Sequence, residues 1–249
     1  SSFPGNGFGF NLGGISKERS KITRVKNYPE NTDIFVSIGF NNPYPINGGD
    51  RSTTDARFVN VALQHSIIAM PENNYKPRMD DPRVGYFTTQ TEDMTNLSSK
   101  PYRDYIHRWH LEKKNPTLAL SEPVKPITWW IENTTPVEFR EIIRTAVLRW
   151  NLVFEKAGFI NAVVVNIQPD DADWDAEDIR YNVLRWTASP SPRFGGYGPS
   201  FVNPRTGEIL GADIMLEYVY FGNILKRLDR FDRAGLDFLD MEAFNANDP

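Results

Sequence analysis

Apolar and polar residues alternate with a period of two through much of the first hundred residues. The clearest run places four apolar side chains on one face: Ile34, Val36, Ile38 and Phe40. Residues 59–67 repeat the pattern and residues 83–90 are a third candidate, with clusters of Asn, Pro and Gly between the runs. A period of two is the spacing of a β-strand with one buried face. The pattern predicts an antiparallel β module without helices over residues 1–100.

Two closely spaced prolines interrupt the middle of the chain. Pro123 and Pro126 disfavour a helix, because proline lacks a backbone N–H and restricts the residue before it. We therefore expect residues 101–126 to form an extended arm. Arginine, lysine and aromatic side chains interleave along it, and in an acidic chain we expect the basic groups to pair with carboxylates.

Apolar residues then recur at three and four positions from Phe139 to Ala157, which predicts one long amphipathic helix. Thr135 is the expected N-cap, Glu138 its partner in a capping box, and Gly158 a natural stop. Strand-like apolar runs lie on both sides of the helix. We therefore expect a βαβ unit, with parallel strands and a right-handed crossover.

Three further strand candidates follow the βαβ unit: residues 180–186, 197–202 and 208–217. The last two are joined by Asn203–Gly207, a hairpin-type connection. Together these segments predict a mixed sheet backed by one long helix over residues 127–221, and the expected fold class is α+β. Residues 222–249 are expected to form a partly helical, acidic tail.

Composition narrows the class of protein. The 249 residues include 28 Lys+Arg and 32 Asp+Glu, a formal net charge of −4, which argues against nucleic acid as a partner. A hydrophobic content of 40% is enough for a sizeable core. The absence of cysteine excludes a disulfide, a thiolate zinc site and a cysteine nucleophile. No apolar run reaches the roughly 18 residues of a membrane span, and the first residues do not resemble a signal peptide.

The three histidines give little support to a metal site within the chain. His107 and His110 are three residues apart, but a catalytic zinc needs three protein ligands and the chain contains no H-E-x-x-H motif. We expect these two side chains to be packed or solvated. His65 lies in phase with an apolar strand face, so we expect a hydrogen-bonded core residue.

An acidic run over residues 170–178 begins like a calcium loop. Ala176 and Asn182 stand where an EF-hand needs Gly and Glu, so the run is not an EF-hand. An irregular calcium site formed by Asp171, Asp173 and Asp175 remains one interpretation, because Ca²⁺ needs only clustered oxygens. The simpler interpretation is a solvated acidic loop.

Several long strings of sequence stand out between residues 80 and 217: Asp81-Pro82-Arg83-Val84-Gly85-Tyr86-Phe87, Arg108-Trp109-His110-Leu111-Glu112, Trp150-Asn151, Phe154-Glu155-Lys156-Ala157-Gly158, Asp178-Ile179-Arg180-Tyr181-Asn182, and Gly198-Pro199-Ser200-Phe201-Val202-Asn203. In this order they resemble large bacterial zinc-dependent metalloproteases of metzincin type. The matching parts of that family are an upstream domain of unknown function and the N-terminal part of the peptidase domain. The resemblance implies a metzincin-like upper subdomain in residues 127–221, a twisted mixed sheet backed by a helix.

The resemblance also implies chemistry whose motif this sequence lacks. In the family a helix with the motif H-E-x-x-H-x-x-G-x-x-H follows this region, binds zinc and supplies the general base. We therefore expect the chain to be inactive by itself, with zinc bound only in a full-length parent. The first hypothesis is a fragment of a zinc-dependent metallopeptidase, a hydrolase. The alternative is a non-enzymatic peptide- or glycan-binding β module.

In this family an antiparallel edge strand lines the cleft, and the peptide substrate adds to it as a further strand. The resemblance places that edge in residues 197–202 or 208–215, and the expected substrate-binding residues are Tyr197, Gly198, Pro199 and Ser200. The expected partners are a peptide or protein substrate and the rest of the peptidase domain.

Peptidases of this kind are exported, so the resemblance favours the periplasm, the cell surface or the extracellular space. Absence of the following helix is expected to expose apolar surface near Trp150. Self-association would cover this surface, or the apolar side chains of the tail would do so: Ile224, Leu225, Leu228 and Phe231.

Overall fold

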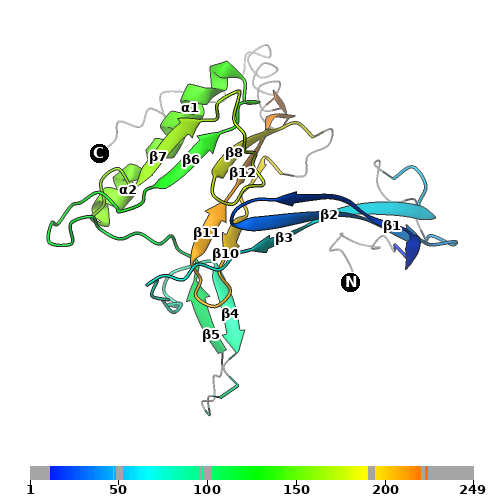
Figure 1. The fold of residues 1–249 in the computed structure, drawn as a ribbon, viewed down its shortest axis with the longest axis horizontal. Coiled ribbons are helices and arrows are strands. Elements are labelled where there is room, and N and C mark those ends of the chain that lie inside the picture. The colour runs from blue at the N-terminus through cyan, green and yellow to red at the C-terminus, as the bar shows by residue number, and fades with distance from the viewer. Residues whose placement is uncertain are drawn as a thin grey trace, which may run out of the picture. The chain divides into compact units, whose positions relative to one another are not determined.

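The structure is a computed structural model, and it describes residues 12–46, 48, 53–92, 94–95, 97, 102–189, 194–219 and 222–223. The chain divides into two compact units, residues 1–72 and residues 73–249. Figure 1 shows the elements of both units.

The first unit is a three-stranded antiparallel sheet in the order β1-β2-β3. β1 spans Gly14–Asn27, β2 spans Asn31–Asn41 and β3 spans Phe58–Ile68. β2 and β3 follow the predicted alternation, and their register pairs Val36 with Leu63. The apolar residues of the two strands therefore share one face of the sheet, as a period of two requires.

The sequence did not predict β1, because basic side chains interrupt its apolar alternation. Its register against β2 shifts between Ser16 and Lys21 and again between Ile22 and Arg24. Such irregularities break the period of two that makes a strand visible in sequence. The expected core position of His65 is also wrong. This side chain is exposed in β3, because the face on which it lies is not buried at that point.

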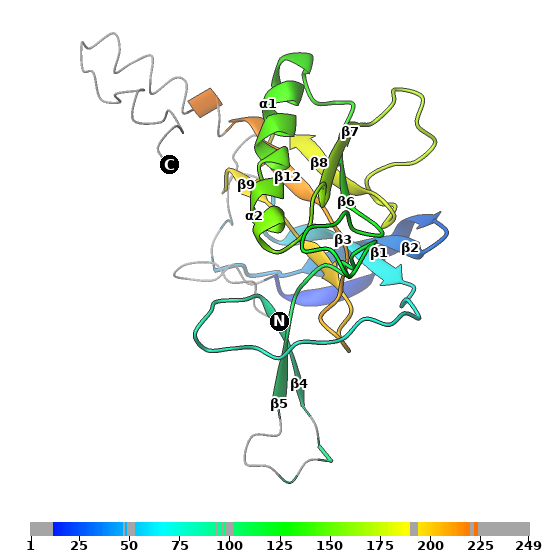
Figure 2. The same cartoon turned by 90° about the vertical axis from the view of Figure 1, so that its left-hand side faces the viewer.

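The second unit contains a five-stranded mixed sheet in the order β7-β6-β8-β12-β9 (Figure 2). Its strands have the following bounds: β6 Ile127–Ile131, β7 Val163–Ile167, β8 Asn182–Thr187, β9 Gly196–Tyr197 and β12 Ile214–Glu217. β6 pairs in parallel with β7 and β8, β12 pairs in parallel with β8, and β9 runs antiparallel to β12. The parallel β6–β7 pair confirms the predicted βαβ pairing.

The predicted long helix is two helices, α1 over Val137–Leu148 and α2 over Asn151–Lys156. The predicted capping box is wrong, because Pro136 is the N-cap of α1 and no side chain caps it. Thr135 is buried in the preceding turn, where its carbonyl oxygen accepts a hydrogen bond from Arg140 Nε at 2.8 Å. Thr135 therefore belongs to the turn that precedes α1 and does not cap the helix.

The core lies between the helices and the five-stranded sheet. Three buried side chains form its centre: Ile131, Val165 and Leu184. From α1, Ile143, Val147 and Leu148 pack against them. Four apolar side chains on or between the two helices are more than half exposed: Ile142 68%, Trp150 61%, Leu152 64% and Val153 56%. Apolar surface is thus exposed near Trp150, as expected from the sequence.

Two small antiparallel sheets complete the second unit. β4 (Thr88–Glu92) overlaps the strand candidate at residues 83–90 and pairs with β5 (Tyr102–Ile106), which lies inside the segment predicted to be an extended arm. β10 (Ser200–Val202) pairs with β11 (Ile209–Ala212), which confirms the predicted hairpin. The expected tail lies outside the described residues, apart from 222–223. The domain boundaries expected after residues 100, 126 and 221 stay predictions.

The predicted α+β class, with a metzincin-like upper subdomain, is wrong. Twelve strands of the described residues form four sheets, against one helix of 12 residues and one of 6. The protein is therefore mostly β. The expectation rested on one amphipathic helix, whereas β1, β4 and β5 consist largely of polar and charged residues that show no apolar period. Within the described residues, no helix is long and apolar enough to cross a membrane.

Candidate functional site

The five-stranded sheet ends in a free edge at β9. Tyr197 and Gly196 pair with Met215 and Leu216 of β12, and no strand of the described residues pairs with the other side of β9. Unpaired backbone groups at such an edge can form hydrogen bonds with an added strand. This edge is the candidate functional site.

Hydrogen bonds on both flanks hold β9 against the sheet. The Glu217 N–H donates to the Gly195 carbonyl at 3.2 Å, and the Asp213 N–H donates to the Pro199 carbonyl at 3.1 Å. In an antiparallel pair, successive residues direct their backbone groups to opposite sides. Residues 195, 197 and 199 therefore face β12, and the backbone groups of Gly196 and Gly198 face outward.

The surface beside this edge is aromatic and open. Tyr197 is 53% exposed and Phe194 is 52% exposed, and their ring centroids lie 5.8 Å apart. At Gly198 an added Cβ atom would make only ordinary van der Waals contact with Ile214. If an extended peptide adds to this edge, the two aromatic rings offer contacts for its side chains.

The structure separates the four residues expected to bind substrate. Tyr197 lies in β9, Gly198 and Pro199 connect it to β10, and Ser200 begins β10 opposite Ala212. The predicted single strand over residues 197–202 is therefore two strands in two sheets. The role of these four residues in binding stays a prediction.

The carboxylate of Glu217 anchors the segment that leads toward β9. This buried side chain accepts hydrogen bonds from Ser189 N–H at 2.8 Å, Ser189 Oγ at 2.7 Å and Thr187 Oγ1 at 3.1 Å. Burial acts to raise the Glu217 pKa, but the hydrogen bonds from Ser189, Val219 and Thr187 outweigh it and lower that pKa. Glu217 therefore holds β8 through its side chain and Gly195 through its backbone.

Asp213 lies at the junction of β11 and β12, and its carboxylate accepts the Val183 N–H of β8 at 3.1 Å. Burial raises its pKa to about 6, with further raising by Glu132 and Glu177, against the lowering effects of the Val183 hydrogen bond and of Arg185. A carboxyl group with a raised pKa therefore lies in the segment that pairs with the edge strand.

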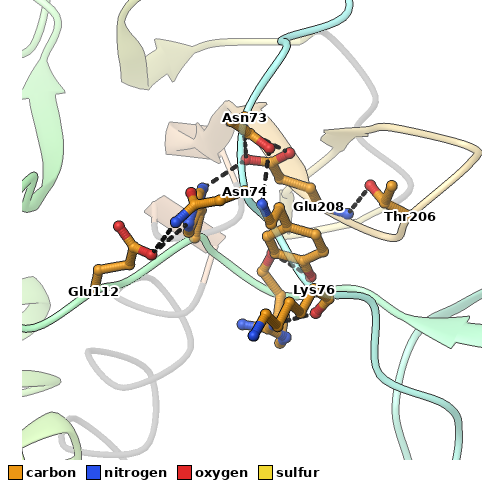
Figure 3. A network of polar contacts seen from close by, with 9 residues as sticks. Asn73, Asn74, Lys76, Glu112, Thr206 and Glu208 are labelled. Atoms are coloured by element: carbon orange, nitrogen blue, oxygen red, sulfur yellow. Dashed lines mark hydrogen bonds and ion pairs between the residues drawn. The ribbon is translucent and has the colours of Figure 1, made fainter.

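A polar network surrounds the buried carboxylate of Glu208, at the start of the segment that becomes β11 (Figure 3). Its oxygens accept two hydrogen bonds from Asn73 Nδ2, at 2.8 and 3.1 Å, and one lies 3.2 Å from His110 Nδ1. The Glu208 N–H donates to Thr206 Oγ1 at 3.3 Å. The network joins a segment at residue 73, the arm and the β10–β11 hairpin.

Sequence reasoning missed all three of these carboxylates. Glu208, Asp213 and Glu217 lie within one predicted strand, residues 208–217, and were counted only as strand residues. A charged residue within an apolar strand needs partners, since an unpaired buried charge is costly. That was the available signal.

The candidate metal residues do not form a cluster. Within the described residues, no group of three or more His, Cys, Asp or Glu side chains is placed to hold a metal ion. His107 Nε2 contacts Thr89 Oγ1 at 2.8 Å, and burial lowers its pKa. Asp171 and Asp173 are exposed, and Asp175 Oδ1 accepts the Glu177 N–H at 3.1 Å in a local turn. Calcium binding by this loop stays a prediction.

Comparisons with known proteins identify one part of the chain. No curated protein and no solved structure matches the chain. A family model does match, and its range contains β1 to β5 and ends before the five-stranded sheet, so the β9 edge lies outside it. The comparisons do not show a metzincin-type protease. Over residues 2–114 the chain carries a domain of unknown function (DUF5117).

Proposed function

We propose that β9 is a peptide-binding edge, and that this chain is the non-catalytic part of a zinc-dependent metallopeptidase. The observation that supports the proposal is the free antiparallel edge at Gly196–Tyr197. A bound peptide pairs with the outward backbone of Gly196 and Gly198 and extends the sheet by one strand. Its side chains on one face contact Tyr197 and Phe194.

The chemistry of this proposal rests on the sequence resemblance. The parent hydrolyses peptide bonds with a zinc-activated water, and its zinc ligands lie outside the described residues. We infer an exported bacterial protein, located in the periplasm or at the cell surface, whose partners are a peptide or protein substrate and the rest of the peptidase domain.

The test removes one outward hydrogen-bond donor. In Gly198→Pro the N–H that faces a bound peptide is lost, while the hydrogen bonds of residues 195 and 199 to β12 remain. We expect the affinity for fluorescein-labelled casein peptides to fall about tenfold, measured by fluorescence polarisation. Gly85→Pro, at an open position in the same unit, is the matched control. Equal affinity in Gly198→Pro and the control would refute the edge as the binding site.

A non-enzymatic peptide- or glycan-binding module is the second candidate, because the same edge can hold a peptide without cleaving it. Zinc-dependent turnover by the full-length parent distinguishes the two functions. Zinc-dependent turnover by these 249 residues, lost in His107→Ala or His110→Ala, would contradict the assignment of the chemistry to another part of the parent.

We also propose that the exposed helix face self-associates in the isolated chain. Ile142, Trp150 and Val153 are each more than half exposed, and such a patch favours association. Sedimentation velocity should show dimers or larger species that decrease in Trp150→Ser. A monomer at all concentrations would exclude this.

A further inference from the structure

His110 lies where three segments of the second unit meet. Its Nδ1 is 3.2 Å from Glu208 Oε1, in the loop before β11, and its Nε2 is 3.7 Å from Glu112 Oε1, in the arm. The third segment supplies Tyr75, whose ring meets the imidazole edge-on with centroids 5.4 Å apart. The imidazole therefore lies between two carboxylates of different segments.

The two ring nitrogens of His110 have different tasks. Glu208 is buried and acts only as an acceptor, so its short contact places a proton on Nδ1. In the neutral ring Nε2 is then an acceptor that faces Glu112, whose oxygen is occupied by Asn74 Nδ2 at 2.7 Å. Protonation turns Nε2 into a donor, and the 3.7 Å gap can close as an ion pair.

The other charged groups at this junction are cations. The Arg108 guanidinium lies over the Tyr75 ring, 4.4 Å from its centroid, and donates a hydrogen bond to the Lys76 carbonyl. The positive charge of Arg78 acts to lower the pKa of Tyr75. Arg108 and Arg78 contribute positive charge at the junction, and Glu208 and Glu112 contribute negative charge. Glu208 is within hydrogen-bonding distance of the imidazole, whereas Glu112 lies 3.7 Å from it.

The junction holds the β10–β11 hairpin against the arm. The Arg108 N–H donates to the Gly207 carbonyl at 3.1 Å, and the Ile209 N–H donates to the Arg108 carbonyl at 3.0 Å. This hairpin begins at Ser200, three residues after Tyr197 of the edge strand. How firmly the hairpin is held therefore affects the end of β9.

We propose that His110 is a pH-operated latch, which holds the β10–β11 hairpin to the arm more firmly when its imidazole is protonated. Acidic pH closes the latch, and neutral pH loosens it. A consequence for peptide capture at β9 rests on the function proposed above, but the latch itself does not depend on that function.

Amide hydrogen exchange of the whole chain tests the latch. We expect the protection factors of the Ile209 and Arg108 amides to be about twofold to fivefold higher at pH 5.5 than at pH 8, as for a partly exposed ion pair. His110→Gln should reduce this difference, and the contribution of Asp213 should remain. Glu112→Gln changes only an exposed partner, so it should fold and reduce the difference. His107→Gln, in the same arm, should leave it intact.

Two results would overturn the latch: an unchanged pH difference in His110→Gln, or a difference that disappears in His107→Gln alone. Peptide affinity, measured with labelled casein peptides at both pH values, is a separate readout. If no peptide binds at either pH while the exchange difference follows His110, the proposed function fails and the latch stands.

Discussion

Asp213 gives the sharpest test of the electrostatics behind the edge strand. Its carboxyl group is partly buried between β11 and β12, and its pKa is raised from 3.8 to about 6. The native state therefore binds a proton more tightly at this site than the unfolded chain does. The resulting stabilisation is complete below pH 3.8 and is lost as the pH rises through 6.

The size of the effect follows from the shift. The difference between 6 and 3.8 is 2.2 pKa units, and at 1.36 kcal/mol per unit this gives a loss of up to about 3 kcal/mol between low and neutral pH. In Asp213→Asn the side chain stays neutral at every pH, and its amide oxygen can still accept the Val183 N–H. We expect the free energy of unfolding of the variant to exceed that of the wild type by up to about 3 kcal/mol at pH 8. Near pH 3.5 the two free energies of unfolding should be equal.

Urea denaturation at pH values from 3.5 to 8 measures the free energy of unfolding of both proteins. The difference in this free energy between variant and wild type is then plotted against pH. Other carboxyl groups with lowered pKa values, such as Glu217, act in the opposite direction and cancel in that difference. Asp173→Asn, at an exposed position, is the control and should give a flat difference. A flat difference for Asp213→Asn as well would refute the argument that burial controls this carboxyl group.

Three further predictions follow from other contacts. Gly207→Ala should destabilise the protein by about 1–3 kcal/mol in urea denaturation, because Gly207 has a φ of 76° and an added Cβ would clash with the Ile106 carbonyl oxygen. Gly85→Ala, at an open position, is the control and should change the stability little. Equal effects of the two substitutions would contradict the clash. Glu217→Gln should cost about 1–3 kcal/mol at pH 7 by disturbing the bonds to Ser189 and Thr187. This deficit should shrink as the pH falls and protonates Glu217, and a deficit that does not change with pH would count against its charge. Residues 1–72 expressed alone should lack the β signal in circular dichroism, because Ala56 is the only buried hydrophobic residue in the described part of that unit.

Elements with a strong apolar period could be predicted from the sequence, and elements without one could not. β2, β3, the βαβ pairing and the β10–β11 hairpin follow directly from apolar spacing and turn residues. β1 is hidden by its basic residues, and the fold class was wrong for the same reason. The break between α1 and α2 could not be predicted, because neither glycine nor proline stands there. Arg149 and Trp150, which separate the two helices, have helical dihedral angles.

The binding role expected for residues 197–200 stays a prediction, and the sequence did not predict how this edge is built. The resemblance directed attention to residues 197–200, of which only Tyr197 lies in the strand at the free edge. The hydrogen bonds that hold this edge join residues far apart in sequence. Examples are the Asp213 carboxylate with the Val183 N–H and the Glu217 carboxylate with the Ser189 N–H. A residue pattern cannot reveal which distant backbone group will need a hydrogen bond.

One ten-residue segment, 208–217, determines where the edge lies. It was predicted as a single strand, but its three carboxylates have different partners: Asn73 and His110 for Glu208, Val183 for Asp213, and Ser189 for Glu217. These attachments accompany its division into β11 and β12, which belong to different sheets. β9 is bonded to the same segment through residues 195–199, so the position of the edge depends on how this segment is held. A peptide bound at β9 would therefore respond to the protonation of Asp213 and, through the hairpin, of His110.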